Sequence, residues 1–385
     1  MRNFKVDILV FGRFHLFDLA KQLNKSGVMN KLFTTYPKYK VKEWGLTKEK
    51  IVSKVIYEII MRLTYKTGIK NYWFNSFLKT LFSNKVSKEL KKNDVFIGSS
   101  GSSLETLIKA KEEGIVTIIE RGCSHYNYQQ NILTEEFSLQ GLKYNPDYPC
   151  WQRELLEYEL ADYISIPSSF VKRSFLEHGI PEEKLLVNPY GVDLSKFKQI
   201  PKTDKIFRII YAGGLTFQKG SHYLLQAFNE LSLENCELWH LGSINEEMRP
   251  YIEKYKNENI KFLGHKPQNE LYKYYSQGSV FIMPSIQEGM AMVQLQAMAC
   301  GLPLVCTTNT GGDDLITKDG EEGFVIPIRN VEAIKEKILF LYENQDIAKE
   351  MGKKAKARVS SGFTWDDYGD RYIKNLERIL VAKNK

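Results

Sequence analysis

Short apolar runs alternate with longer amphipathic segments along most of the chain. In the first half, "VDILVFG" from Val6 and "VTIIERG" from Val116 are strand-like runs that lead into segments with helical periodicity. In the second half, "FRIIYAGG" from Phe207 and "SVFIMPS" from Ser279 do the same. Because strands joined by crossover helices form parallel sheets, the alternation predicts an α/β protein with doubly wound parallel sheets.

One polar stretch interrupts this rhythm near the middle of the chain. "VNPYGVDLSKFKQIPKTDK", residues 187–205, contains two prolines and a glycine and is typical of a linker. We therefore predict a Rossmann-like domain over 1–190, a linker over 191–205 and a second Rossmann-like domain over 206–364. The last segment, 365–385, is a helical pattern with no following strand, and we expect it to pack back on the first domain. Two such domains would face a central cleft, where ligands of parallel sheets bind.

The positive charge of the chain is concentrated in one segment. The 385 residues carry a net charge of +8, but residues 38–92 hold 14 Lys/Arg and 4 Glu, a net +10, which leaves −2 elsewhere. A basic coat for nucleic acid is therefore not indicated, and no nucleic-acid partner is predicted.

Within this basic insertion, 51–66 is predicted to form an amphipathic helix that has an apolar residue every four positions. Basic side chains beside an apolar stripe suit an anionic membrane surface. The alternative is a helix that covers the sheet and leaves its lysines in water.

Cysteine usage and hydropathy predict a cytoplasmic protein. The five cysteines are scattered and form no CxxC pair, a pattern typical of reduced thiols. The first apolar run is too short for a signal peptide, and no run approaches the roughly 20 apolar residues that span a bilayer. Peripheral contact of 38–92 with the inner face of the cell membrane is the alternative location.

Two strand ends in the second half carry residues suited to an anionic ligand. Gly213 and Gly214 allow close approach to the backbone, and Lys219 adds a charge for phosphate. A tight turn with a solvated lysine would produce the same pattern.

A helix is expected to begin near Gly289, directly after Glu288. The N–H groups of its first turn, at Met290, Ala291 and Met292, would then face the cleft and favour anions. Glu288 would stay at the cleft, unless it serves only as a helix cap.

Three stretches of the second half resemble the family 4, or group 1, glycosyltransferases. They are "GGLTFQKG", "YYSQGSVFIMPSIQEGMAMVQLQAMACGLPLV" and "TGGDDLITKDGEEGFVIP", and the linker also looks like that of the family. The resemblance implies the GT-B fold, two Rossmann-like domains with the nucleotide sugar held mainly by the second. It further implies that Glu288 contacts donor-sugar hydroxyls, Lys219 neutralises the diphosphate, and Gln296 reaches the ribose. The backbone from Gly289 to Met292 would hold the sugar and diphosphate.

Two residues depart from the family pattern. Gly214 stands where an arginine is usual, so Lys219 or Arg13 would carry more of the diphosphate charge. Gln296 stands in place of a second glutamate, which would weaken ribose binding by about 1 kcal/mol without abolishing it.

The first domain is expected to contribute residues from two loops. Gly12 and Arg13 follow the first strand, and we place both among the donor-binding residues. His125 is the best match to the family's histidine near the anomeric carbon, which makes it a candidate catalytic residue with Glu288 and Lys219. Glu120 and Arg121 are candidates for the acceptor.

The resemblance implies a retaining hexosyltransferase that moves a sugar from a UDP- or GDP-linked donor to a hydroxyl of a glycan or lipid-linked acceptor. Synthesis of a bacterial cell-surface polysaccharide or glycolipid is the setting we expect. No cofactor or metal is predicted, because the adjacent acids in "GGDDL" and "WDDY" lack an Asp-x-Asp arrangement. A nucleotide-sugar epimerase and a non-catalytic partner subunit that binds nucleotide sugar are the two alternatives.

Overall fold

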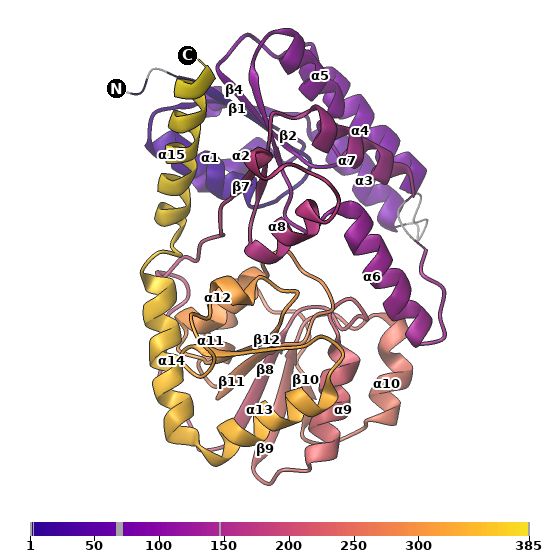
Figure 1. Cartoon of the computed structure of the whole chain (residues 1–385), viewed down its shortest axis with the longest axis vertical. Coiled ribbons are helices and arrows are strands. Elements are labelled where there is room, and N and C mark those ends of the chain that lie inside the picture. The colour runs from indigo at the N-terminus through magenta and orange to yellow at the C-terminus, as the bar shows by residue number, and fades with distance from the viewer. Residues whose placement is uncertain (1, 3, 67–71, 146–147, 384–385) are drawn as a thin grey trace.

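The computed structural model describes residues 2, 4–66, 72–145 and 148–383, so residues 67–71 of the basic segment lie outside the described part. Figure 1 shows two α/β units stacked along the long axis, with both chain ends at the upper unit, which is built from the first half. Each unit contains one sheet covered by helices.

The first sheet has seven parallel strands in the order β3-β2-β1-β4-β5-β6-β7. Its central strands are buried along their full length because helices cover both faces, as expected of a parallel sheet. The strands are β1 Val6–Val10, β2 Met29–Thr34, β3 Ile51–Ser53, β4 Val95–Ser99, β5 Val116–Glu120, β6 Tyr163–Ile166 and β7 Leu185–Val187.

The second sheet has six parallel strands in the order β10-β9-β8-β11-β12-β13. The strand order reverses between β8 and β11, with β9 and β10 on one side and β12 and β13 on the other. Doubly wound sheets bind ligands at such a point, at the carboxyl ends of their strands. The strands are β8 Phe207–Ala212, β9 Cys236–Leu241, β10 Ile260–Phe262, β11 Val280–Met283, β12 Leu304–Thr307 and β13 Gly323–Ile326.

Helices connect successive strands in both units, and α13, α14 and α15 follow the last strand. In the first half they are α1 Leu16–Lys25, α2 Lys38–Val41, α3 Val55–Lys66, α4 Tyr72–Ser87, α5 Leu104–Glu112, α6 Tyr126–Leu139, α7 Tyr148–Leu160 and α8 Ser169–Leu176. In the second half they are α9 Ser221–Leu231, α10 Arg249–Lys254, α11 Leu271–Tyr275, α12 Met292–Ala299, α13 Val331–Glu343, α14 Gln345–Ser360 and α15 Trp365–Lys383.

The predicted helix over 51–66 is wrong at its start. Ile51–Ser53 forms the edge strand β3, which pairs with β2, and the helix α3 begins only at Val55. Consecutive β-branched residues beside an open sheet edge favour the strand. Val55, Ile59 and Leu63, which follow the predicted four-residue step, are exposed, so this stripe does not cover the sheet.

The chain crosses between the two units at two adjacent places. Val192 in the linker pairs with Thr364, the residue before α15, and Val192 N–H donates to Phe363 O at 2.8 Å. Gly191 is required here because a Cβ would lie 2.5 Å from the Thr364 carbonyl carbon. Beyond this point α15 runs along α1 of the first unit, on the left in Figure 1. The domain boundaries given above remain a prediction.

Among the residues that the structure describes, no helix combines the length and hydropathy needed to cross a membrane.

Candidate active site

The loops that follow β8 and β11 meet at the point where the strand order of the second sheet reverses. Gly213, Gly214 and Lys219 lie on the first of these loops, and Glu288 lies on the second. The main residues predicted from the sequence therefore lie at the ends of neighbouring strands, where sheets of this kind bind ligands in a crevice.

Lys219 and Glu288 form an ion pair between these two loops. Lys219 Nζ donates to Glu288 Oε1, and both side chains are partly accessible to water. Gly220 makes this contact feasible: its φ is +58°, and a Cβ would lie 2.0 Å from Pro284 O at the end of β11. Gly220 was not among the predicted residues, although a glycine directly before a helix was the available signal.

Gly213 and Gly214 have a clear packing reason in addition to their predicted ligand role. Gly213 has a φ of +148°, and its carbonyl oxygen lies 2.8 Å from His240 Nε2. A Cβ on the facing Gly242 would lie 2.0 Å from that same oxygen. Tyr211 OH donates to Gly214 O at 2.8 Å, so the turn is held from both sides.

Helix α12 begins at Met292, three residues later than predicted. Gly289 lies at a bend, Met290 also lies outside the helix, and Ala291 is the N-cap with extended backbone. The N–H groups without helical partners therefore belong to the turn that starts at Met292. Met290 and Ala291 have buried side chains, so any contact that they make with a ligand would come from their backbone.

Gly289 is the point where this loop touches the first unit. A Cβ there would lie 1.9 Å from Gly122 O, and Gly289 O accepts a hydrogen bond from Ser168 Oγ at 2.7 Å. The neighbouring Gln287 Nε2 lies 2.8 Å from Ser124 Oγ. The loop with Glu288 is thus fixed against the loops of the first unit.

Gln296 lies one turn along α12 and is buried. Its Oε1 has no hydrogen-bond partner among the described residues. A buried carbonyl oxygen without a donor is uncommon in folded proteins and often marks a site that water or a ligand completes.

Gly12 and Arg13 lie where the first sheet faces this crevice. Gly12 has a φ of +78°, and its N–H donates to Thr35 Oγ1 at 2.8 Å. The Arg13 guanidinium lies 5.3 Å from the ring centroid of Trp44, and its Nη2 makes a long contact of 3.4 Å with Gln268 Oε1 of the second unit. Arg13 therefore connects the two units.

His125 is placed differently from the expectation. It is the N-cap of α6, where its Nδ1 accepts a hydrogen bond from Asn127 N–H at 3.3 Å. Its ring is buried between Tyr158 and Phe175 and stacks on His178 with centroids 4.3 Å apart. Burial, followed by the charges of His178 and Arg121, lowers the pKa of His125 to about 3. A neutral, enclosed cap does not fit the predicted position beside the reacting sugar.

Glu120 and Arg121 are also committed to internal contacts, which argues against the predicted acceptor role. Glu120 Oε2 lies 2.9 Å from His15 Nε2, and both side chains are buried. Arg121 Nη1 lies 2.7 Å from Glu154, and its Nε donates to Ser124 O. Burial alone would lower the pKa of Arg121, but Glu154 raises it above its ordinary value. His15, two residues after Arg13, was not among the predicted candidates.

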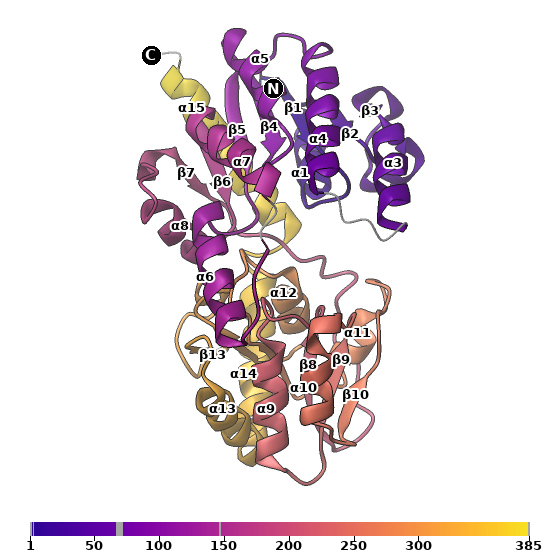
Figure 2. The same cartoon turned by 90° about the vertical axis from the view of Figure 1, so that its right-hand side faces the viewer.

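Helix α6 reaches from the first unit onto the second, as Figure 2 shows. Its Glu136 is fully buried and accepts hydrogen bonds from His222 at 2.9 Å, Tyr223 at 3.0 Å and Arg329 at 2.7 Å. Burial would raise the pKa of Glu136, but the bonds from His222 and Arg329 lower it. No local signal in the sequence marks Glu136, because its partners lie 86 to 193 positions away.

The adjacent acids of "GGDDL" join the same interface. Asp314 accepts hydrogen bonds from the N–H and hydroxyl groups of Ser169, and Asp313 pairs with Arg173 at 2.9 Å. Within the described ranges, no group of three or more His, Cys, Asp or Glu residues is arranged to hold a metal ion.

The second half of the chain matches a known family. Residues 193–358 match the family described as "Glycosyl transferases group 1". The capsular polysaccharide biosynthesis glycosyltransferase CapM of Staphylococcus aureus is 26% identical over 234 residues, 55% of this chain and 61% of CapM. The amylovoran biosynthesis glycosyltransferase AmsK of Erwinia amylovora is 25% identical over 250 residues, 59% of this chain and 61% of AmsK. The chain spans about half the length of other curated relatives it matches.

Solved structures resemble the chain over nearly its whole length. Sucrose-phosphate synthase from Thermosynechococcus elongatus has a TM-score of 0.74 at 15% identity, over 99% of this chain and 100% of that protein. HepE of Anabaena, solved with UDP-glucose, has a TM-score of 0.73 at 15% identity, over 98% of this chain and 100% of HepE. These likenesses show the fold, and the predicted GT-B architecture is confirmed.

Proposed function

Residues 193–358 belong to the group 1 glycosyltransferases, and from this we propose that the protein transfers a sugar from a nucleoside diphosphate sugar to a hydroxyl group of an acceptor. The observation that carries the proposal is the pairing of Lys219 with Glu288 at the reversal point of the second sheet. A cation and a carboxylate beside a helix start suit a diphosphate and sugar hydroxyls respectively.

Each candidate residue then has a defined part in donor binding. The Lys219 ammonium would turn from Glu288 to the diphosphate, and Glu288 would accept hydrogen bonds from hydroxyls of the donor sugar. The backbone from Gly289 to Met292 would border the sugar and diphosphate. Gln296 Oε1, which lacks a partner in the described chain, would accept a hydrogen bond from a ribose hydroxyl.

Arg13 and the turn at Gly213 and Gly214 complete the donor site in this proposal. Arg13 already contacts the second unit through Gln268, so it can supply the positive charge that Gly214 does not. Gly12 would let the first loop of the first unit approach the sugar.

We further propose that transfer retains the anomeric configuration. The acceptor hydroxyl would attack from the face that the diphosphate leaves, and the leaving phosphate would take the hydroxyl proton. The protein would contribute positioning and stabilisation of the developing charge on the diphosphate. His125 has no part in this scheme because its ring is enclosed and its Nδ1 caps α6.

For the acceptor we propose a glycan or lipid-linked glycan of a bacterial surface polysaccharide. CapM and AmsK, by their names, take part in capsular polysaccharide and amylovoran biosynthesis. The exposed Ile56, Ile59 and Leu63 of α3 lie in the basic segment 38–92 and support contact with an anionic membrane. Sedimentation with phosphatidylglycerol vesicles should show binding at low salt, and its absence there would remove the membrane contact.

Thermal unfolding with a panel of nucleotides tests donor binding. UDP, GDP, UDP-glucose and GDP-mannose are offered at equal concentration, and at least one should raise the Tm because it binds only the folded state. A flat response to the whole panel would contradict the proposal. Incubating the stabilising donor with and without a glycan acceptor then separates transfer from epimerisation, which needs no acceptor.

A further inference from the structure

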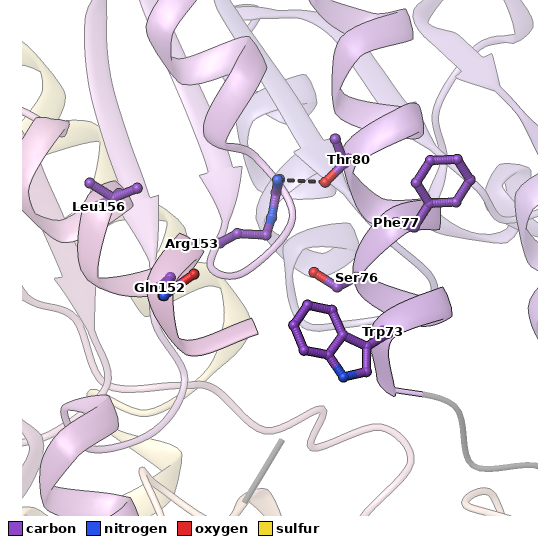
Figure 3. Close-up of a pocket in the computed structure, with 7 residues that line it drawn as sticks. All are labelled: Trp73, Ser76, Phe77, Thr80, Gln152, Arg153 and Leu156. Carbon is purple, nitrogen blue, oxygen red and sulfur yellow. Dashed lines mark hydrogen bonds between the residues drawn. The ribbon is translucent and has the colours of Figure 1, made fainter. Parts of the chain in front are cut away.

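A groove of about 330 Å³ lies between α4 and α7, apart from the loops of the candidate active site (Figure 3). Its volume is at the lower end of small-molecule sites, which occupy about 300–1,000 Å³. Two helices of the first unit line it, with Trp73, Ser76, Phe77 and Thr80 from α4, and Gln152, Arg153 and Leu156 from α7.

The floor of the groove is polar but carries no uncompensated charge. Arg153 Nη1 lies 2.7 Å from Thr80 Oγ1 and 2.6 Å from Glu105 Oε1, and Arg153 Nη2 lies 2.8 Å from Glu105 Oε2. This two-point pairing neutralises the guanidinium, so a phosphate or carboxylate would have to compete with Glu105. The same contacts join α4, α5 and α7, which gives a preformed floor that favours an uncharged ligand.

The walls of the groove are apolar and exposed. Trp73 is 72% exposed, Phe77 is 54% exposed and Leu156 is 45% exposed. A ring as large as tryptophan is rarely left this open without a partner, and its flat face and N–H suit an amphipathic ligand. Gln152 is exposed and adds an amide on the α7 side, opposite Trp73 in Figure 3.

A sugar ring matches this combination better than a hydrocarbon chain does. A pyranose presents C–H groups to an aromatic face while its hydroxyls meet neutral polar groups. A hydrocarbon chain would instead take water away from the Gln152 amide without replacing its hydrogen bonds, at about 1–3 kcal/mol for a polar group left without a partner. The exposed apolar stripe of α3 offers lipid a surface without that polar floor.

We infer that this groove binds a neutral sugar residue of the acceptor glycan, separate from the residue that receives the new sugar. The inference rests on the proposed function in identifying the glycan as an acceptor. Position supports it: α4 begins at the end of the first unit that faces the second unit (Figure 2). A glycan seated there would extend toward the crevice that holds Lys219.

Saccharide binding without transfer tests this assignment. Saturation-transfer NMR and calorimetry are run with methyl glycosides of glucose, galactose and N-acetylglucosamine and with neutral linear trisaccharides. At least one probe should bind the unaltered protein, and Trp73→Ala should weaken it about tenfold or more, as loss of a central aromatic contact does. Gln152→Ala should weaken it less.

Tyr39→Ala is the matched control, because Tyr39 is 70% exposed and does not line the groove. It should leave saccharide binding unchanged, and the melting curves of all variants should match. Absence of binding by every probe, or equal binding by Trp73→Ala, would overturn the inference. So would a Trp73→Ala variant that loses vesicle binding alone, since that result assigns the tryptophan to a membrane.

The donor measurement separates the two proposals. If nucleotides bind and no saccharide does, the groove assignment fails and the proposed function stands. If saccharide binding depends on Trp73 and no nucleotide binds, the groove is a glycan site and the proposed donor site fails.

Discussion

At the carboxyl ends of the second sheet, Lys219 pairs with Glu288 on the surface of the crevice, whereas at the same edge of the first sheet Glu120 pairs with His15 inside the domain. The two edges carry similar residue types after similar strands. They differ in exposure: the second unit leaves its pair within reach of a ligand, and the first unit uses its buried pair to join the end of β5 to the N-cap of α1. Burial, not residue type, therefore separates the candidate ligand groups from the structural ones.

Removing the carboxylate should mainly lower stability in the buried pair and mainly lower donor binding and transfer in the accessible pair. Glu120→Ala leaves the buried imidazole of His15 without its partner and creates a cavity, so the free energy of unfolding should fall by about 2–4 kcal/mol. Glu288→Ala removes a partly accessible ion pair, so the loss should be about 1 kcal/mol or less, while donor binding and transfer fall. Urea unfolding and a transfer assay measure both effects; equal stability losses would contradict the comparison.

A second buried acid of the first unit should make stability depend on pH. Burial raises the pKa of Glu157 to about 7, although Gly101 N–H and Ser103 N–H both donate to it. The folded pKa exceeds the unfolded one, so the favourable contribution is complete below the unfolded pKa and is lost as the pH rises through 7. We expect the free energy of unfolding to fall by about 3 kcal/mol from this group between pH 5 and 8.

Urea midpoints across that range measure the slope, and Glu157→Gln should reduce it. Asp7→Asn is the matched variant. Burial raises the pKa of Asp7 to about 6, so the stability that Asp7 contributes should be lost at a lower pH than that of Glu157. A slope that Glu157→Gln leaves unchanged would show that this carboxyl is not the source.

Within the crevice, Lys219→Ala should lower transfer about a hundredfold, on the scale of one lost contact to developing charge. Lys219→Arg keeps the charge and should retain more activity, which separates the electrostatic contribution from a change in loop shape. Rates at saturating donor and the Tm of each variant are measured together. Near-normal turnover of Lys219→Ala would remove this residue from the diphosphate site.

The smallest expected effect belongs to Gln296. Gln296→Glu would give a ribose hydroxyl a charged acceptor in place of an amide, which should strengthen donor affinity by about 1 kcal/mol, or several-fold. Calorimetric titration with the stabilising nucleotide measures the change. A large loss of affinity would show that the amide is specifically required.

Much of the fold could be predicted because it rests on local patterns. Strands such as "FRIIYAGG" and "SVFIMPS" were identified from their apolar residues, and the parallel topology followed from the alternation. The strand at Ile51–Ser53 was missed because its partner β2 lies about twenty residues away. The late start of α12 was missed because Gly289 packs closely against Gly122 O of the other unit, a contact that no local pattern indicates.

The candidate residues of the second unit were easier to locate than those of the first. Lys219 and Glu288 follow neighbouring strands, so topology alone brings them together. His125 and Arg121 also follow a strand, but the next turn of chain directs His125 to cap α6 and Arg121 to meet Glu154. These contacts depend on residues that are distant along the chain, and a single sequence does not show which distant residues meet.

The twin crossing at Val192 and Thr364 has a consequence for how the molecule can be divided. The first unit is not a continuous stretch of chain, since the last helix returns to cover it with Tyr368, Tyr372 and Leu376 buried. A fragment that ends after the linker would expose the apolar surface of the first unit that α15 covers. A fragment that starts after the linker would carry α15 without the surface on which it packs. Cutting the gene in two would therefore yield pieces that each need the other, unless residues 365–383 are supplied back to the amino-terminal piece.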